Sequence, residues 1–178
     1  MDSKDIIENY HYEKLSQKHD LSNFSCGVDD LDEFLKEDAL KEQEENLNVT
    51  YIAVYENEII GFVTILSDNV PYSIVKKNVK TKYKSYPSVK IGRLGVNINY
   101  KGLKIGTMIL DDICTDIKEL SEEIGIKFIV VDSYCSARKF YLKNSFTPIN
   151  LHNPKKAKRK ALRDKYKTIT MFKDIKKI

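Results

Sequence analysis

The first periodic pattern along the chain lies between residues 27 and 47. Apolar residues at helical spacing share one face of this segment: Leu31, Phe34, Leu35, Ala39 and Leu40. Asp30 and Glu33 stand three positions apart, which is the spacing of a capping box at a helix start. We therefore expect a first helix here, with one buried face and one charged face.

Short apolar runs separated by polar residues predict strands. Residues 50–55 and 59–66 read TYIAVY and IIGFVTIL, and the polar Glu56-Asn57-Glu58 between them predicts an antiparallel hairpin. Further strands are predicted over residues 88–98, 127–132, 146–149 and 167–172. The continuous apolar run at 127–132 is typical of a strand that is covered on both faces.

The longest helical pattern follows the strand at residues 88–98. Its apolar positions recur in steps of four and three, at Ile105, Ile109, Ile113, Ile117, Leu120 and Ile124. Gly125 stands where a helix stop is expected, and a short helix is predicted over residues 137–144. Residues 69–87 show no clear period and are left unassigned. The order of elements predicts a mixed α/β fold with a central sheet.

Composition is that of an ordinary globular protein. The chain has 178 residues, of which 42% are hydrophobic and 31% charged, and no linker marks a boundary, so we expect a single domain over residues 1–178. Residues 1–10 lack the basic start and apolar middle of a signal peptide. No apolar run reaches the roughly 20 residues of a membrane span. We therefore expect a cytoplasmic protein that does not bind membranes.

Cysteine and histidine are few and scattered. Cys26, Cys114 and Cys135 form no CxxC pair, and the three histidines lie far apart. A disulfide framework or a zinc site needs closer, regular spacing. The sequence therefore predicts no metal site.

Basic residues concentrate near the carboxyl end, although the formal net charge is only +4. The segment from Lys155 to Lys167 carries eight Lys and Arg residues against one acid, Asp164, whereas residues 29–45 are largely acidic. Two interpretations of the basic segment stay open. It is either a solvated surface or a surface that attracts a polyanion.

The sequence NYKGLKIGTMIL, residues 99–110, joins the strand at 88–98 to the long helix. Gly102 and Gly106 allow the backbone to approach a ligand closely, and the first N–H groups of a helix attract anions. The Gly-Lys pair of the NTPase phosphate loop is missing, and the spacing does not fit a dinucleotide-binding fingerprint. A plain glycine turn and a pyrophosphate loop of another kind remain.

The turn resembles the pyrophosphate loop of the GNAT family of acetyl-CoA-dependent N-acetyltransferases. The family pattern is Arg or Gln, two residues, Gly, one residue, Gly or Ala. Lys101 takes the first position, Lys104 replaces the middle glycine, and Gly106 takes the last position. Residues 137–146, ARKFYLKNSF, resemble a second family segment, Ala-x-x-Phe-Tyr-x-x-x-Gly-Phe, with Ser145 in place of its glycine. Two segments in the expected elements make the resemblance specific.

The resemblance implies the GNAT fold, a central mixed sheet of about six to seven strands flanked by about four helices, and acetyl-CoA as cosubstrate. It implies that the coenzyme contacts Leu94, Val96, Lys101, Gly102, Lys104, Ile105, Gly106 and Thr107. Tyr141 matches the family tyrosine that acts as general acid toward the coenzyme A sulfur, with packing beside Phe140 as the alternative. Asp132 is a candidate general base, although a capping or turn role is favoured.

A closer resemblance is to the acetyltransferase toxins of bacterial toxin–antitoxin pairs. It rests on the segments FSCGVDDLDEFL, GFVTIL, YPSVKIGRLGVNINYKG and TITMF. Those proteins acetylate the amino group of aminoacyl-tRNA and are neutralised by small ribbon-helix-helix antitoxins. The resemblance therefore implies an amine acceptor, tRNA bound through Lys155 to Lys167, and a ribbon-helix-helix partner.

Other functions and assemblies stay open on the sequence. The acceptor is alternatively a small amine or a protein amine. A non-catalytic module that binds acyl-CoA or nucleic acid is an alternative of another class. The tyrosines between Tyr72 and Tyr86 offer a surface for a homodimer.

Overall fold

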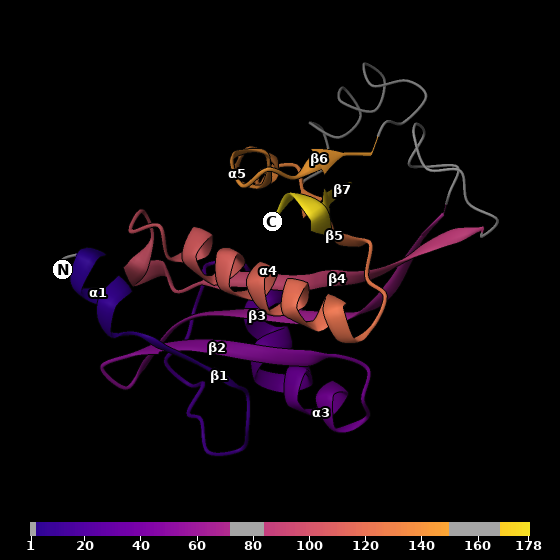
Figure 1. Cartoon of the computed structure of the whole chain (residues 1–178). Helices are drawn as coiled ribbons and strands as arrows, with labels where there is room; N and C mark the ends of the chain where they lie inside the picture. The colour runs from indigo at the N-terminus through magenta and orange to yellow at the C-terminus, as the bar shows by residue number, and fades with distance from the viewer. Residues whose placement is uncertain (1–2, 72–83, 150–167) are drawn as a thin grey trace. The chain divides into compact units, whose positions relative to one another are not determined.

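The computed structural model describes residues 3–71, 84–149 and 168–178 (Figure 1). The chain gathers into two compact units. One consists of residues 1–66 and 91–113, and the other of residues 67–90 and 114–178. The predicted single domain over residues 1–178 stays a prediction.

The first unit contains the amino-terminal helices and strands. Its complete elements are α1 (Ser3–Asn9), β1 (His11–Lys14), α2 (Asp29–Glu33), the π-helical turn η1 (Phe34–Asp38), α3 (Ala39–Glu44), β2 (Val49–Tyr55) and the 3-10 turn η2 (Ile98–Tyr100). Three long elements have residues in both units: β3 (Glu58–Pro71), β4 (Ser85–Val96) and α4 (Ile105–Glu123).

The second unit completes the set of elements with β5 (Phe128–Tyr134), α5 (Arg138–Lys143), β6 (Thr147–Pro148), β7 (Thr168–Asp174) and the 3-10 turn η3 (Ile175–Lys177). The strands follow the order β1-β2-β3-β4-β5-β7-β6 in a seven-stranded sheet. This confirms the predicted α/β class with a central mixed sheet.

The predicted hairpin is confirmed, because β2 and β3 pair antiparallel. Glu56 and Asn57 form its two-residue turn, and both have positive φ, 48° and 67°. A type I′ hairpin turn requires positive φ at both central residues. The turn is therefore one residue shorter than the polar triplet in the sequence indicates.

The polar amino-terminal residues predicted neither α1 nor β1. Ile6 of α1 is nevertheless fully buried. The Tyr55 hydroxyl donates a hydrogen bond to the Asp5 carboxylate, and the Tyr10 hydroxyl donates one to Asp112 of α4. One apolar side chain and two tyrosine–carboxylate contacts thus hold α1. A single buried apolar residue does not produce a periodic pattern in the sequence.

The start of the first predicted helix differs from expectation. Its N-cap residue is Val28, whose side chain makes no capping hydrogen bond, so the capping box predicted for Asp30 and Glu33 is wrong. Asp32 instead reaches back along the chain. Its carboxylate accepts a hydrogen bond from the Cys26 N–H at 2.7 Å and another from the Ser25 hydroxyl at 2.7 Å.

A π-helical turn interrupts the helix between α2 and α3. Leu31, Leu35 and Ala39 are spaced by four residues, which would drift around an ideal α-helix, yet all three are buried. The wider π turn absorbs the extra rotation and keeps these residues on one face.

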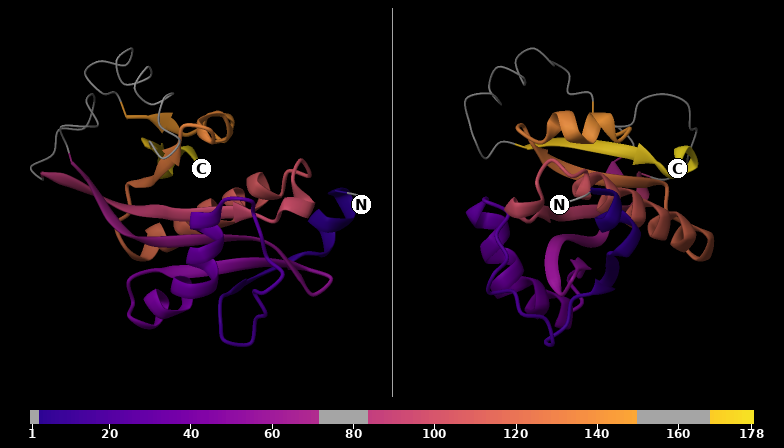
Figure 2. Two further views of the ribbon diagram at one scale, coloured as in Figure 1. Left: turned by 180° about the vertical axis from the view of Figure 1, so that it is seen from behind. Right: turned by 90° about the vertical axis from the view of Figure 1, so that its left-hand side faces the viewer.

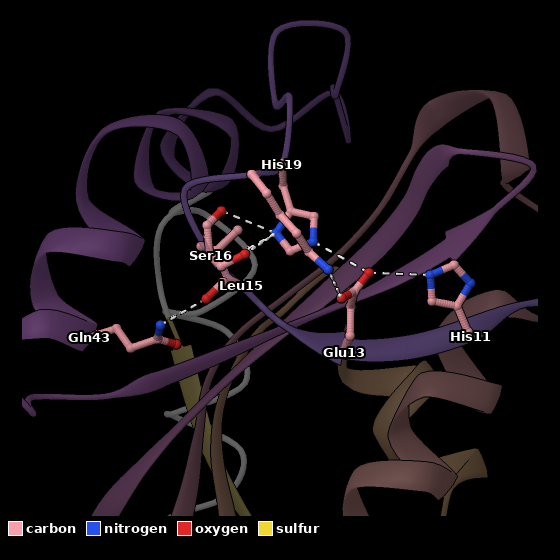
Figure 3. A network of polar contacts seen from close by, with 7 residues as sticks. His11, Glu13, Leu15, Ser16, His19 and Gln43 are labelled. Atoms are coloured by element: carbon pink, nitrogen blue, oxygen red, sulfur yellow. Dashed lines mark hydrogen bonds and ion pairs between the residues drawn. The ribbon is translucent and has the colours of Figure 1, made fainter.

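Gln43 fastens this helix to the sheet. Its side-chain amide donates to the Leu15 carbonyl at 2.9 Å (Figure 3). It also accepts from the Thr50 N–H at 3.0 Å. The helix is therefore tied to both β2 and the chain that follows β1.

In the first unit, β3 is covered on both faces. Phe62 is fully buried and meets Phe24 edge to face, with ring centroids 5.6 Å apart, in the cluster that includes Leu35. The neighbouring Gly61 faces α4, because a Cβ there would lie 2.5 Å from the Ile109 Cδ1 atom. Figure 2 accordingly shows the helices of residues 29–44 and α4 on opposite sides of the strands.

The long helix is confirmed, but its apolar stripe ends early. The first four predicted positions, through Ile117, are buried, whereas Leu120 and Ile124 are 43% and 55% exposed. Gly125 follows the helix end without the left-handed backbone of a glycine cap. None of the described helices, α4 included, is long and apolar enough to cross a membrane.

The strands that flank residues 69–87 extend into that unassigned segment. Residues 69–71 end β3 and residues 85–87 begin β4, while residues 72–83 lie outside the described part of the chain. At its other end β4 stops at Val96, two residues before the predicted strand boundary.

In the second unit, β5 pairs antiparallel with β7 along its whole length. Phe128 meets both Tyr86 and Phe172 edge to face, with ring centroids 5.3 Å apart in each pair. The Lys127 ammonium bridges to the Asp174 carboxylate at 2.6 Å beside these rings. This packing holds β5 and thereby the start of α5.

A polar network holds the loop that follows β1 (Figure 3). The Glu13 carboxylate accepts a hydrogen bond from Lys18 Nζ at 2.6 Å and lies 3.3 Å from His19 Nε2 and 3.2 Å from His11 Nε2. The hydrogen bond from Lys18 is the main reason why the pKa of Glu13 falls to about 2. Glu13 is therefore the anionic centre of the network.

Candidate active site

Asn97 directs the chain out of β4. It is buried, its Nδ2 donates to the Ile59 carbonyl at 3.1 Å, and its Oδ1 accepts the Asn99 N–H at 3.1 Å. These bonds attach the end of β4 to β3 and start the 3-10 turn η2. The chain thus leaves the sheet at a fixed point just before the glycine turn.

Tyr100 anchors the start of that turn. Its ring is buried and its hydroxyl donates to Glu58 Oε2 at 2.7 Å. Burial and then this hydrogen bond raise the pKa of Tyr100 to about 12. The hydroxyl consequently keeps its proton at neutral pH, and the contact persists.

The turn itself contains two left-handed residues, Gly102 with φ 86° and Lys104 with φ 64°. The Lys104 carbonyl accepts the N–H groups of Thr107 at 2.9 Å and Met108 at 3.1 Å, so Lys104 caps α4. The N–H groups of the first helical residues have no partner inside the helix and, with the helix dipole, favour an anion. The geometry is that of an anion-binding turn.

Both departures from the family pattern keep a backbone that suits glycine. Lys104 replaces the middle glycine of the turn, and Ser145 replaces the glycine that follows α5, where φ is 68°. Left-handed backbone costs a residue with a Cβ about 1–2 kcal/mol. The fold therefore imposes the glycine conformation at both positions although the side chains differ.

The Lys101 side chain lies beside the loop that precedes α2. Its Nζ would be 3.5 Å from a Cβ at Gly27, a residue with φ 73°. The neighbouring Cys26 thiol is buried, and its burial is the main cause that raises its pKa to about 11. Lys101 thus connects the turn with the residue 25–28 loop, and Cys26 is an unreactive, protonated thiol.

The residues implied to hold pantetheine lie on β4. Leu94 and Val96 are half-buried and share one face of the strand. Gly95, between them, faces the other way, since a Cβ there would lie 2.5 Å from the Phe62 ring. The first unit therefore brings together all eight residues predicted to contact the coenzyme.

Tyr141 belongs to the second unit, on α5. It is only 6% exposed, and its ring meets Phe140 and Phe146 edge to face at 5.0 and 5.4 Å. Burial raises the pKa of Tyr141, so the phenol is protonated at every physiological pH. Tyr141 therefore packs beside Phe140, as the alternative interpretation of the sequence had it, and these contacts also fix the direction of its ring.

Asp132 takes neither the capping nor the turn role favoured by its sequence position. It lies within β5, where Oδ2 accepts from Lys90 Nζ at 2.6 Å and Oδ1 from the Thr170 hydroxyl at 2.6 Å. Although burial alone would raise it, the pKa of Asp132 is lowered by the hydrogen bonds from Lys90 and Thr170. A carboxylate engaged at both oxygens is a weak candidate for a general base.

Sequence analysis missed three residues that shape the site. Asn97 and Tyr100 fix the turn from either side of η2, and Arg93 of β4 holds its guanidinium over the Phe34 ring. The local sequence held no signal for Arg93, since β4 also contains the basic Lys90. The basic segment from residue 155 to residue 167 lies outside the described residues.

A strand that leads into a left-handed turn and a helix N-terminus presents backbone N–H groups that favour an anion such as a phosphate. The chain belongs to the Acetyltransferase (GNAT) family, whose sequence pattern matches residues 13–146. It is therefore an acyltransferase and uses acetyl-CoA as acetyl donor. Membership of an enzyme family sets aside the non-catalytic module.

Two curated relatives are similar in sequence. The chain is 24% identical over 135 residues to the "tRNA-acetylating toxin" of Mycobacterium tuberculosis, which covers 75% of this chain and 81% of that protein. It is 28% identical over 121 residues to the "Probable toxin TacT" of Sinorhizobium fredii. This match covers 65% of this chain and 66% of that protein.

Solved structures share the fold. A tyrosine-to-phenylalanine mutant of KacT superposes with a TM-score of 0.81 at 20% identity, over 95% of this chain and 96% of that one. The structure of AtaT complexed with acetyl-methionyl-tRNAfMet has a TM-score of 0.80 and 21% identity, over 95% of this chain and 96% of that one. AtaTR bound with AcCoA gives 0.77 at 22% identity, over 96% of each chain. These likenesses confirm the GNAT fold.

Proposed function

We propose that this protein transfers the acetyl group of acetyl-CoA to the α-amino group of an aminoacyl-tRNA. The observation that carries the proposal is the left-handed backbone of Lys104, a conformation that suits the glycine which the family pattern has at this position. The acceptor is argued separately, from the relatives and from the chemistry of the amine.

The turn binds the coenzyme's pyrophosphate in this proposal. The N–H groups of Ile105, Gly106 and the preceding Lys104 supply hydrogen bonds, and the dipole of α4 favours the negative charge. The Lys104 side chain is exposed and adds an ammonium beside the phosphates. Leu94 and Val96 hold the pantetheine through their backbone groups.

Tyr141 is the general acid of the transfer. The acceptor nitrogen forms its bond to the acetyl carbonyl carbon, the carbon–sulfur bond breaks, and Tyr141 gives its proton to the departing thiolate. Its raised pKa means that Tyr141 carries the proton before the transfer. The nitrogen loses its own proton to water, because Asp132 is engaged by Lys90 and Thr170, and water returns a proton to the Tyr141 phenolate.

An aminoacyl acceptor suits a site without a strong base. An α-amino group has a pKa near 8 and is partly neutral at pH 7, whereas a lysine amine is almost wholly protonated. The name of one curated relative, a tRNA-acetylating toxin, supports tRNA as the acceptor, and the other relative is called a probable toxin. A small amine or a protein amine is the second candidate acceptor.

The basic segment from Lys155 to Lys167 is proposed to bind tRNA phosphates, and this rests on its charge alone. A small antitoxin of the ribbon-helix-helix type is the proposed protein partner. Neighbouring structures support an antitoxin partner, because they include AtaT bound to the C-terminus of the antitoxin AtaR and a KacTA–DNA complex.

The test is coenzyme A release from acetyl-CoA across a panel of acceptors. We expect release with aminoacyl-tRNA and little with polyamines, aminoglycosides or peptides. Deacylated tRNA is the matched control, because it has the same phosphates and lacks the α-amino group. Release that is strong with a small amine and absent with aminoacyl-tRNA would replace the proposed acceptor by the second candidate.

A further inference from the structure

Arg93 is a cation without a counter-ion in the described part of the chain. Its guanidinium carbon lies 4.9 Å from the centroid of the Phe34 ring, and its Nη1 donates to the neighbouring Gly92 carbonyl at 3.2 Å. Its Nε is buried and has no hydrogen-bond partner among these residues. None of the ion pairs among the described residues includes Arg93.

Such an arrangement is unfavourable unless a ligand completes it. A guanidinium remains charged at any physiological pH, and a buried donor without an acceptor loses its hydration without compensation. The Phe34 ring stabilises the cation from one side but accepts no hydrogen bond in the plane of the fork. That planar fork matches a carboxylate or a phosphate, so the missing group is an oxyanion.

The position of Arg93 on β4 identifies which molecule carries the oxyanion. The pyrophosphate turn follows β4, so a coenzyme held as proposed extends from residues 101–107 back along the strand past Val96 to Leu94. At roughly 3.3 Å per residue, Arg93 lies about 10 Å before Val96, farther from the turn than either of the two pantetheine residues. The coenzyme's phosphates are at the turn, and the oxyanion at Arg93 therefore belongs to the acceptor.

We propose that Arg93 binds a backbone phosphate at the aminoacylated end of tRNA, an assignment that rests on the proposed function. The terminal nucleotide bears a phosphodiester close to the ester that holds the amino acid. Binding it at Arg93 brings the α-amino group to the part of β4 that holds the thioester. Phe34 supports the side chain by packing against its guanidinium face.

The test compares Arg93→Gln and Arg93→Lys with Lys41→Gln, which removes an exposed cation of α3. Steady-state kinetics are measured with aminoacyl-tRNA and with an amino acid methyl ester, which has neither a phosphate nor a free carboxylate. Calorimetry measures acetyl-CoA binding. For Arg93→Gln we expect KM for aminoacyl-tRNA to rise about 10- to 100-fold. We also expect the slope of log binding constant against log salt concentration to correspond to one phosphate contact fewer. Arg93→Lys should lie in between, because it keeps the charge and loses the fork.

Each remaining readout separates the alternatives. The assignment requires an unchanged acetyl-CoA affinity, an unchanged rate with the methyl ester and a melting temperature that does not fall. Equal losses with both acceptors would overturn it. If the unsubstituted protein fails to acetylate aminoacyl-tRNA, the proposed function fails first; if it succeeds and Arg93→Gln behaves like Lys41→Gln, only the role of Arg93 is wrong.

Discussion

The carbonyl oxygen of Lys104 accepts the backbone N–H of Thr107 at 2.9 Å while Lys104 itself has a φ of 64°. A lysine in left-handed conformation thus caps α4 at the point where related turns have glycine. The backbone that an anion meets is preserved, and a positive charge is added beside it. The strain at Lys104 and the charge of its side chain have separable consequences.

Replacement of Lys104 by glycine should stabilise the fold and weaken coenzyme binding. Relief of left-handed strain, less the entropy that glycine adds to the unfolded chain, amounts to about 0.5–1 kcal/mol. This corresponds to a rise in melting temperature of about 1–4 °C. Loss of the ammonium should weaken acetyl-CoA binding about 3- to 10-fold in calorimetry.

Ser145→Gly is the matched control, since Ser145 has the same backbone conformation with φ 68° and a neutral side chain. It should raise the melting temperature similarly and leave acetyl-CoA affinity unchanged. If Lys104→Gly also leaves the affinity unchanged, the Lys104 ammonium does not touch the coenzyme.

Gly61→Ala should destabilise the protein by about 1–3 kcal/mol through overpacking. The new Cβ would lie 2.5 Å from Ile109 Cδ1 and 3.0 Å from the Gly95 carbonyl, which is backbone and cannot rotate away. Gly125→Ala is the control, because nothing lies within 4 Å of its added Cβ. Urea unfolding measures both, and equal stability of the two variants would contradict the packing of α4 on β3.

Tyr141→Phe should reduce kcat by about 10²- to 10⁴-fold, the usual contribution of a general acid. The ring contacts with Phe140 and Phe146 survive the substitution, so the melting temperature and acetyl-CoA affinity should not change. Stopped-flow measurement of coenzyme A release checks the rate. A variant with the original kcat would leave Tyr141 with a packing role only.

Asp132→Asn should lower stability and spare catalysis. The substitution breaks the ion pair with Lys90, whose partly exposed side chains limit the loss to about 1 kcal/mol. We expect kcat to fall less than about tenfold, where removal of a general base would cost 10²- to 10⁴-fold. A pH–rate profile provides the check, and the disappearance of its acidic limb in this variant would make Asp132 the base after all.

Glu13→Gln should destabilise the protein at neutral pH and lose that effect in acid. The pKa of Glu13 is lowered from its ordinary 4.5 to about 2, chiefly by Lys18, so the native state favours the carboxylate. Its contribution to stability is complete above pH 4.5 and declines as the pH falls toward 2. Melting temperatures at pH 7, 5 and 3 should converge for the two proteins, and a constant difference would show that Glu13 acts without its charge.

Periodicity predicted the elements that bury apolar surface. The α4 stripe and the hairpin of β2 and β3 each bury apolar residues at regular positions, and the spacing of apolar residues in the sequence predicts such elements. Helix α1 and strand β1 escaped because tyrosine–carboxylate contacts such as Tyr55 with Asp5 hold them in place of a periodic face. The π turn η1 was readable only as an unusual four-residue spacing.

The sequence pattern identified the position of the candidate turn but not its backbone conformation. Lys104 and Ser145 were identified as substitutions, but a sequence does not state φ, and only the structure shows that both keep the glycine conformation. Arg93 was passed over because its significance lies in what it lacks, a carboxylate partner among the described residues. Such an absence depends on tertiary packing and leaves no local pattern.

The most direct test of the account is mass spectrometry of the terminal nucleoside released from aminoacyl-tRNA after incubation with the protein and acetyl-CoA. The account predicts one acetyl group on the α-amino nitrogen of the amino acid, formed by the unsubstituted protein and strongly reduced by Tyr141→Phe. An unmodified aminoacyl nucleoside, under conditions in which the same preparation releases coenzyme A with another amine, would contradict it.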